Sequence, residues 1–133
     1  MIYSAEEFVR LRDSTEKDEY DRASMDEAEV SVWLDVIDRY PEYRRWVAYN
    51  KTVPLDVLGV LCEFDADVRR FVAAKRKLPA ELFERLSRDS SSVVRVAIAA
   101  NKKTPISIVE RLMQDSDEDV ASSARYNYEN RKI

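Results

Sequence analysis

The stretch VRRFVAAKRKLP at residues 68–79 decides the fold, because two other segments of the chain align with it. These are YRRWVAYNKTVP at residues 43–54 and VRVAIAANKKTP at residues 94–105. The final prolines of the three segments are 25 and 26 residues apart. A period between about 20 and 50 residues is typical of solenoids, whose units cannot bury their apolar face alone and stack on their neighbours. The sequence therefore predicts an all-α solenoid with a period of about 25 residues.

Each proline is expected to open a helix. The residue before a proline is pushed out of the helical region, so Val53, Leu78 and Thr104 should end a linker, and proline itself suits the first helical position. Positions +1, +4 and +7 after each proline are apolar or small, which predicts a core-facing stripe on a longer helix. These positions are Leu55, Leu58 and Leu61, then Ala80, Phe83 and Leu86, then Ile106, Val109 and Leu112.

A shorter helix is expected before each proline, over about eight residues from Tyr43, Val68 and Val94. Alanine recurs at one matched position of these helices, where a small side chain lets stacked layers approach closely; the three are Ala48, Ala73 and Ala99. The linkers between units are rich in aspartate and serine at residues 65–67, 89–92 and 115–119, and their side chains are predicted to cap the next short helix. A fourth, atypical copy runs from Val120 to about Asn127.

The N-terminal part predicts a helical cap. Ser4 with Glu7 and Ser24 with Glu27 both match the capping box, so helices are expected to start at these two serines. The second would run from about Met25 to Asp38 and bury an apolar stripe. Residues 13–24 fit either a short helix or a loop. The expected organisation is a single domain over residues 1–133, with an acidic cap at 1–42, repeats at 43–127 and a tail at 128–133.

The pattern Val-Arg-x-x-Val-Ala followed by proline, Leu-x-x-Leu and an aspartate-rich turn, as in residues 68–89 and 94–115, resembles the leucine-rich repeat variant family. That family is related in shape to HEAT repeats, and the likeness covers about residues 32–127. The resemblance implies alternating short and long helices in a right-handed superhelix. It implies nothing about a specific partner. The cysteine-bound iron–sulfur cluster of one founding member is not implied, because this chain lacks the cysteines.

Composition narrows the classes of function. The 133 residues include no histidine, one cysteine and one glycine, so the usual general base, zinc ligands and phosphate-cradling glycine loops are missing. Cys62 is expected to be a buried small hydrophobe. We expect neither a cofactor nor a metal, and not an enzyme, although Asp35 and Asp38 were considered as an acid–base pair. The sequence shows no membrane-spanning apolar run and an acidic N-terminus, which favours a cytoplasmic protein.

Charge is unevenly distributed. Residues 1–42 hold 13 acidic and 5 basic residues, whereas residues 43–111 hold 8 acidic and 14 basic ones. The loops before the prolines predict a basic edge, and the aspartate-rich linkers predict an opposite acidic edge. The helix at residues 55–64 is apolar almost all round, so either the N-terminal segment or a partner should cover it; we expect the N-terminal segment.

A protein-binding scaffold is the favoured function, because stacked helices supply a broad surface without special chemistry. The specific hypothesis is a cytosolic, bacterial-type immunity protein that neutralises a basic toxin or nuclease by covering its active site. Ordinary solvation of an acidic helix face is the alternative for the acidic cap. Candidate partner-binding residues are Asp13, Glu16, Asp18, Glu19, Asp21, Trp33, Trp46, Tyr49, Glu81, Glu84, Arg85, Arg88, Glu110 and Arg111.

The alternative function is binding to nucleic acid through its phosphates. It would use the basic loop residues, with aromatic residues stacking on bases, against an overall isoelectric point near 5.0. These basic residues are equally well explained as solvated loop side chains. They are Lys51, Arg76, Lys77, Lys102 and Lys103.

Overall fold

The computed structural model describes residues 1–131, and this part of the chain is helical throughout, with no β-strand. A single isolated bridge joins Ile2 to Ala28. The all-α class is confirmed, whereas the solenoid form and its handedness stay predictions. The α-helices are α1 (Ala5–Asp13), α2 (Lys17–Met25), α3 (Val30–Arg39), α4 (Arg44–Tyr49), α5 (Leu55–Leu61), α6 (Ala66–Ala73), α7 (Ala80–Ser87), α8 (Ser92–Ala100), α9 (Ile106–Leu112) and α10 (Glu118–Arg131), with a 3₁₀ turn at Pro41–Tyr43.

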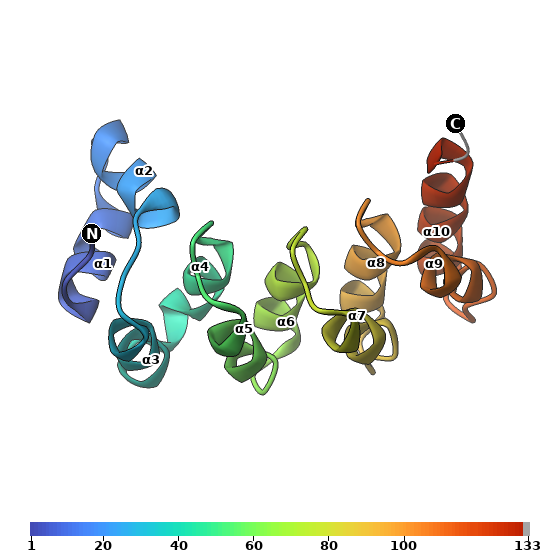
Figure 1. The fold of residues 1–133 in the computed structure, drawn as a ribbon, viewed down its shortest axis with the longest axis horizontal. Coiled ribbons are helices and arrows are strands. Elements are labelled where there is room, and N and C mark those ends of the chain that lie inside the picture. Colours follow the sequence, from blue (N-terminus) through green and yellow to red (C-terminus); the bar gives the residue numbers. More distant parts are fainter. Residues whose placement is uncertain (132–133) are drawn as a thin grey trace. The chain divides into compact units, whose positions relative to one another are not determined.

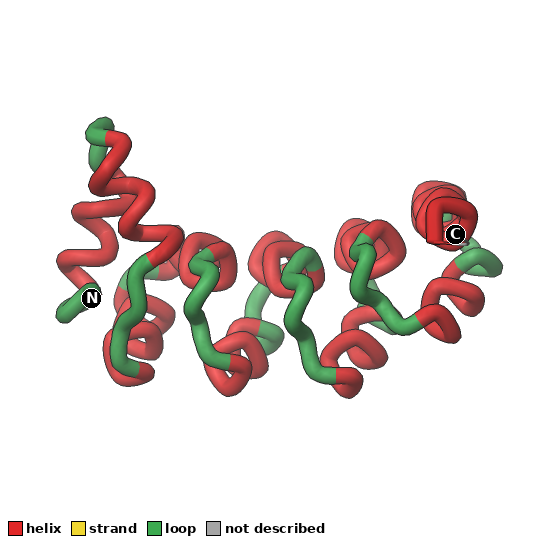
Figure 2. Tube along the Cα trace, turned by 45° about the horizontal axis from the view of Figure 1, so that its top comes forward, coloured by secondary structure: helices red, strands yellow, loops and turns green. Residues whose placement is uncertain are grey.

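The helices form two compact units, Met1–Phe64 (unit 1) and Asp65–Ile133 (unit 2). Unit 1 contains α1 to α5 and unit 2 contains α6 to α10 (Figure 1). Short loops connect successive helices in both units (Figure 2).

Unit 1 is built around the contact between α1 and α3. The rings of Phe8 and Trp33 meet edge to face with centroids 5.2 Å apart, and both side chains are fully buried. The extreme N-terminus closes this core, since Ile2 is also fully buried and its N–H donates to the Glu27 carbonyl at 2.8 Å. Residues 1–4 are therefore an ordered part of unit 1.

Of the two capping boxes predicted for this unit, one is confirmed and the other is wrong. Ser4 caps α1 as expected, accepting the Glu7 N–H at 3.0 Å, while the Glu7 carboxylate reaches back to the Tyr3 N–H at 2.6 Å. The prediction of a helix start at Ser24 is wrong. Ser24 lies in the last turn of α2, where its hydroxyl donates to the Asp21 carbonyl, and α3 begins six residues later at Val30. Residues 13–24, left open between helix and loop, mostly belong to α2.

Each proline does precede a helix, but the helix starts one residue after the proline and not at the proline itself, as had been predicted. Pro54, Pro79 and Pro105 are extended N-cap residues of α5, α7 and α9 rather than their first helical residues. The expected stripe shifts accordingly: position +1 is exposed in all three helices, and positions +3, +4 and +7 are buried. The missed buried residues at position +3 are Val57, Leu82 and Ile108.

The predicted alternation of short and long helices is not observed. The helices before the prolines, α4, α6 and α8, have 6, 8 and 9 residues, and those after them, α5, α7 and α9, have 7, 8 and 7. The helices α6 and α8 start two residues earlier than expected, because the linker residues Asp65 and Ser91 become their N-caps. The end of each linker is therefore part of the helix that follows it.

The predicted alanines are fully buried, and within unit 2 buried asparagines explain their close packing. Asn101 Nδ2 donates to the carbonyls of Ala73 and Lys75, at 2.9 and 2.7 Å. Asn127 repeats this arrangement, donating to the carbonyls of Ala99 and Asn101 at 2.8 and 3.0 Å. We call these the asparagine bridges; the first joins α8 to the end of α6, and the second joins α10 to the end of α8.

Unit 1 contains a related contact. Asn50, which aligns with Asn101, is fully buried and donates to the carbonyls of Ala23 and Asp26, at 2.9 and 3.0 Å. This contact joins the end of α4 to the end of α2. Helix α2 thus takes, against α4, the place that α6 takes against α8.

Matched arginines form a second recurring contact. Arg69 and Arg95 each bind, through two nitrogens, the aspartate twenty residues ahead, which is Asp89 for the first and Asp115 for the second. Arg44 has Phe64 at that spacing and lies over its ring instead, 4.0 Å from the centroid. Burial alone would raise the pKa of both aspartates, but hydrogen bonds from arginine and from a backbone N–H hold both below the ordinary value.

Other linker aspartates act as caps, as predicted for the helix starts. Asp65 accepts the Val68 N–H at 3.1 Å, and Asp117 accepts the N–H groups of Asp119 and Val120. Several aspartates of these linkers therefore have structural roles as helix caps or arginine partners, and do not simply form an acidic edge.

The last helix differs from the expected fourth copy. Helix α10 continues to Arg131, so a tail starting at residue 128 is wrong as far as the described residues reach; residues 132–133 lie outside them. Since no proline follows Asn127 where the other copies have one, nothing in the sequence ends the helix there. Cys62, by contrast, is buried as expected.

The expected cover over α5 is also absent. Helices α1 and α2 pack on α3 and α4, and Leu55 and Val60 remain 50% and 39% exposed. A Cβ atom added at Gly59 would meet nothing within 4 Å. Helix α1 instead packs against the buried face of α3, where Trp33 lies.

The asparagine bridges lead to a test of stability. Replacing Asn101 with alanine would leave the buried carbonyl of Ala73 and the Lys103 N–H without their partner, so we expect unfolding to become easier by about 2 kcal/mol. Urea denaturation measures this change. Asn130→Ala, which removes only an exposed bond to the Tyr126 carbonyl, is the control and should change stability by less than about 0.5 kcal/mol.

The ion pairs of unit 2 predict a pH dependence. The pKa of Asp115 is lowered by folding, so its stabilising contribution is complete above the unfolded value near 3.8 and is lost as the pH falls through the lower folded value. Asp115→Asn should therefore cost about 2 kcal/mol at neutral pH and less at pH values below about 4. Glu118→Gln, in an ion pair that is mostly exposed, should show neither effect. An Asp115→Asn penalty that is unchanged in acid would contradict the assignment.

Candidate interaction surfaces

The acidic residues predicted on α1 and α2 fall into two groups. Glu19 and Asp21 form ion pairs with Arg10 and Lys17, at 2.8 and 2.6 Å. The hydrogen bond from Arg10 lowers the pKa of Glu19. These two carboxylates are engaged within unit 1. The remaining three candidates are exposed: Asp13, Glu16 and Asp18.

Asp13 makes one internal contact. It accepts the Tyr43 hydroxyl at 2.6 Å, and this bond raises the pKa of Tyr43 to about 12. The contact ties the end of α1 to the turn before α4.

Every basic residue of segment 1–42 has an internal contact. Four of them pair with carboxylates: Arg10, Lys17, Arg22 and Arg39. Arg12 lies over the Trp46 ring, 3.7 Å from its centroid. Within the described residues, seven exposed carboxylates of the same segment have no ion pair. We call them the surplus carboxylates: Asp13, Glu16, Asp18, Glu27, Glu29, Asp38 and Glu42.

The three aromatic candidates differ in how far they are exposed. Trp33 is fully buried against Phe8, so its assignment as a partner-binding residue is wrong. Its indole nitrogen also has no hydrogen-bond partner in the described part of the chain, so its role is packing. Trp46 is half-buried and meets Tyr49 edge to face at 5.8 Å, and Tyr49 is 47% exposed. The apolar stripe predicted on this helix is buried at Trp33, Val36 and Ile37, so Trp33 belongs to the core with the rest of the stripe.

The charged residues predicted on α7 and α9 form a network within unit 2. Glu84 binds Arg88 at 2.7 Å and Arg111 at 3.0 Å, and Arg111 also donates to the Ser87 hydroxyl. The bond from Arg88, with the charges of both arginines, lowers the pKa of Glu84. Three other candidates, Glu81, Arg85 and Glu110, are exposed on the same helices.

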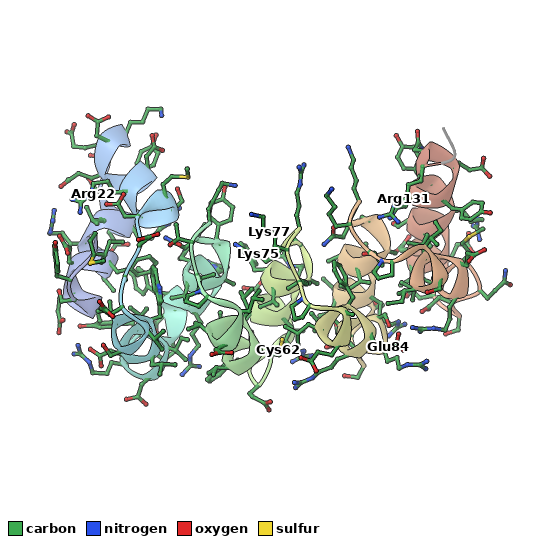
Figure 3. The ribbon with its side chains drawn as sticks, in the orientation of Figure 1. Arg22, Cys62, Lys75, Lys77, Glu84 and Arg131 are labelled. Carbon is green, nitrogen blue, oxygen red and sulfur yellow. The ribbon has the colours of Figure 1, made fainter. Side chains whose placement is uncertain are left out.

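The basic candidates of unit 2 lie in two corresponding loops. Arg76 and Lys77 precede α7, Lys102 and Lys103 precede α9, and all four side chains are exposed. In the view of Figure 3, Lys77 and Arg131 lie toward the upper edge of unit 2 and Glu84 toward the lower edge. The remaining basic candidate, Lys51, is exposed in unit 1, with its ammonium 5.9 Å from the Tyr49 ring centroid.

A depression of about 710 Å³ lies beside Lys102, between the end of α8 and helix α10. Arg131 borders it and donates to the carbonyls of Asn101, Lys102 and Thr104, so this guanidinium is occupied by the loop. Sequence reasoning missed most of its lining, because the extension of α10 that brings these residues there has no counterpart in the other copies. The missed residues are Ser122, Ser123, Tyr126, Asn130 and Arg131.

A second depression, of about 570 Å³, lies in unit 1 on the outer face of α3. Its lining includes Tyr3, Leu34 and the two aspartates once weighed as an acid–base pair, Asp35 and Asp38. Asp35 binds Arg39 through both oxygens, and this bond lowers the pKa of Asp35. Residues 31, 34, 35 and 38 have the spacing of one helix face, which is the signal that could have identified this surface from the sequence.

Comparison of the chain with protein-family models, curated proteins and solved structures gives no significant match. The resemblance to leucine-rich repeat variants accordingly remains a prediction. Among the described residues, no helix is both long and apolar enough to cross a membrane.

The different surroundings of the two tryptophans can be tested by substitution. Trp33→Ala removes a fully buried ring and should destabilise unit 1 by about 3–5 kcal/mol, whereas Trp46→Ala should cost about 1 kcal/mol. Trp33→Phe retains the edge-to-face contact and should recover most of the loss. Urea denaturation measures all three. Equal penalties for Trp33→Ala and Trp46→Ala would contradict the burial described above.

Proposed function

We propose that this chain is a non-catalytic protein-binding scaffold whose partner is a basic protein. The observation that carries the proposal is the set of surplus carboxylates in unit 1. Nearby cations already neutralise the other carboxylates of segment 1–42, whereas the surplus carboxylates, including Asp13 with its bond from the Tyr43 hydroxyl, have no ion pair in the described structure. Their charge is available to a partner.

The chemistry of the surplus carboxylates favours a partner rich in lysine and arginine. Exposed carboxylates that no cation neutralises raise the association rate of a cationic protein and disfavour acidic competitors. A pair of helices offers enough surface for a standard interface, which buries roughly 800 Å² on each partner. No reacting group on the scaffold is required for such binding.

The specific form of the proposal is a cytosolic immunity or inhibitor protein that occludes a basic toxin or nuclease. A nuclease needs a cationic site to hold its phosphate substrate, and an acidic surface of another protein can occupy that site in place of nucleic acid. Inhibition would then follow from occlusion alone. This form agrees with the absence of histidine and of other usual catalytic groups from the sequence.

Binding of phosphate groups in unit 2 is the second candidate. It is favoured by the depression beside Lys102, where the exposed ring of Tyr126 lies near two serine hydroxyls. An exposed aromatic ring next to a cation is suited to a nucleotide base and its phosphate. The engagement of Arg131 by three backbone carbonyls weighs against this candidate, because it leaves fewer free cations.

Charge reversal tests the leading proposal. We expect the combined variant Glu16→Lys, Asp18→Lys, Glu27→Lys and Glu29→Lys to bind its partner about 100-fold more weakly, since each reversal replaces attraction by repulsion. Affinity capture from lysate of the native organism with mass spectrometry identifies the partner, and titration at two salt concentrations measures binding. The thermal midpoint of the variant should be nearly unchanged, because these four side chains have no ion pair in the described structure.

The matched control reverses the same number of exposed acidic residues in unit 2: Glu81, Glu110, Asp119 and Glu129. This control should bind as tightly as the unaltered chain. Capture that is insensitive to the variant of unit 1, or a captured partner that is acidic, would contradict the proposal. A salt-sensitive shift of a single-stranded oligonucleotide that is lost in Lys102→Glu would favour the second candidate instead.

A further inference from the structure

We infer that the depression on the outer face of α3 is the contact site for a lysine or arginine side chain of the basic partner. We call it the α3 site, formed by Tyr3, Leu34 and Asp38 with their neighbours. The inference rests on the proposed function and adds a location to it. None of Tyr3, Leu34 and Asp38 is among the partner-binding candidates predicted from the sequence.

The floor of the α3 site follows from helix geometry. Trp33, Val36 and Ile37 face the core of unit 1 and are buried, so the opposite face of α3 carries Ser31, Leu34, Asp35 and Asp38. Leu34 is 40% exposed at one edge of this face, where Ser31 and Asp38 are its neighbours three positions before and four positions after it in the helix. An apolar side chain between polar neighbours is the arrangement found in the middle of many protein interfaces.

Tyr3 forms one wall and is held in place through its backbone. Its side chain is 76% exposed, yet its own N–H donates to the Glu7 carboxylate at 2.6 Å and the preceding N–H, that of Ile2, donates to the Glu27 carbonyl. A ring that is presented to solvent from a fixed backbone loses little conformational entropy when a partner binds. Tyrosine is also among the residues that most often anchor interfaces.

The charges around the α3 site favour a cation. Arg39 is the basic side chain at this face, and it is bound by both Asp35 and Glu6 at 2.7 Å. Asp38 is exposed, and no ion pair holds it among the described residues. The Arg39 guanidinium is therefore bound by two carboxylates, and Asp38, which has no ion pair, borders the depression.

These features together match the shape of a lysine or arginine side chain. Its apolar stem would lie along Leu34, and its charged end would reach Asp38. The face of the Tyr3 ring can add a cation–π contact. The depression beside Lys102 in unit 2 offers a cation in place of this carboxylate, so it would not select the same ligand.

The test uses the full chain and a short synthetic peptide of alternating lysine and leucine, with an alternating glutamate and leucine peptide as the control. Nuclear magnetic resonance titration locates binding residue by residue. The lysine peptide should shift the backbone amides of Tyr3, Ser31, Leu34 and Asp38, and the glutamate peptide should not. Asp38→Asn should weaken binding about fivefold and Tyr3→Ala about tenfold.

Glu129→Gln is the matched control, because Glu129 is an exposed carboxylate of unit 2, and it should leave binding of the lysine peptide unchanged. Shifts centred on α2, with Asp18→Asn weakening binding and Asp38→Asn neutral, would overturn the α3 site while leaving the proposed basic partner intact. Absence of any shift with the lysine peptide would overturn it as well. Failure of the proposed function is a separate result, seen when the captured partner is acidic or ignores charge reversal in unit 1.

Discussion

The buried asparagine amide is the contact on which the packing of α6 against α8 and of α8 against α10 depends. A carbonyl at the end of a helix lacks an intrahelical partner, and leaving it buried without one is costly. Asn101 satisfies such carbonyls at the end of α6, and Asn127 does so at the end of α8, with Nδ2 distances between 2.7 and 3.0 Å. The buried alanines Ala73 and Ala99 make this reach feasible, since they let the backbones lie close together.

Carboxylates serve three different purposes in this chain, which explains why overall charge says little about function. Asp65 and Asp117 cap helices, and Asp89 and Asp115 bind arginines of their own unit. The surplus carboxylates of unit 1 are left over, as are exposed carboxylates of unit 2 such as Glu81 and Glu110. The electrostatic character of the surface is therefore set by the carboxylates that have no structural role.

The proposals for unit 1 follow from this division. A basic partner is attracted by the surplus carboxylates at long range, but long-range attraction alone gives little selectivity between cationic proteins. The α3 site would add short-range selectivity, because Leu34 and Tyr3 offer apolar contact next to the free carboxylate of Asp38. Attraction and recognition would thus be separate properties of neighbouring surfaces.

The sequence by itself determined the helical class, the helix starts after the three prolines and the burial of the matched alanines. These features depend on local backbone preferences and on spacing along one helix, which are encoded within a few residues. The helix start expected at Ser24 was wrong. A capping residue precedes the first turn of its helix and has a non-helical backbone, whereas Ser24 is itself a helical residue in the last turn of α2.

Only the tertiary structure decided which side chains are available to a partner. Trp33 looked like an anchor but fills the core against Phe8, and Glu19 and Asp21 looked free but pair with Arg10 and Lys17. Tyr3 was not noticed, because its position beside Leu34 depends on a backbone bond between Ile2 and Glu27. Such contacts join residues far apart in the chain, and exposure depends on them rather than on the local pattern.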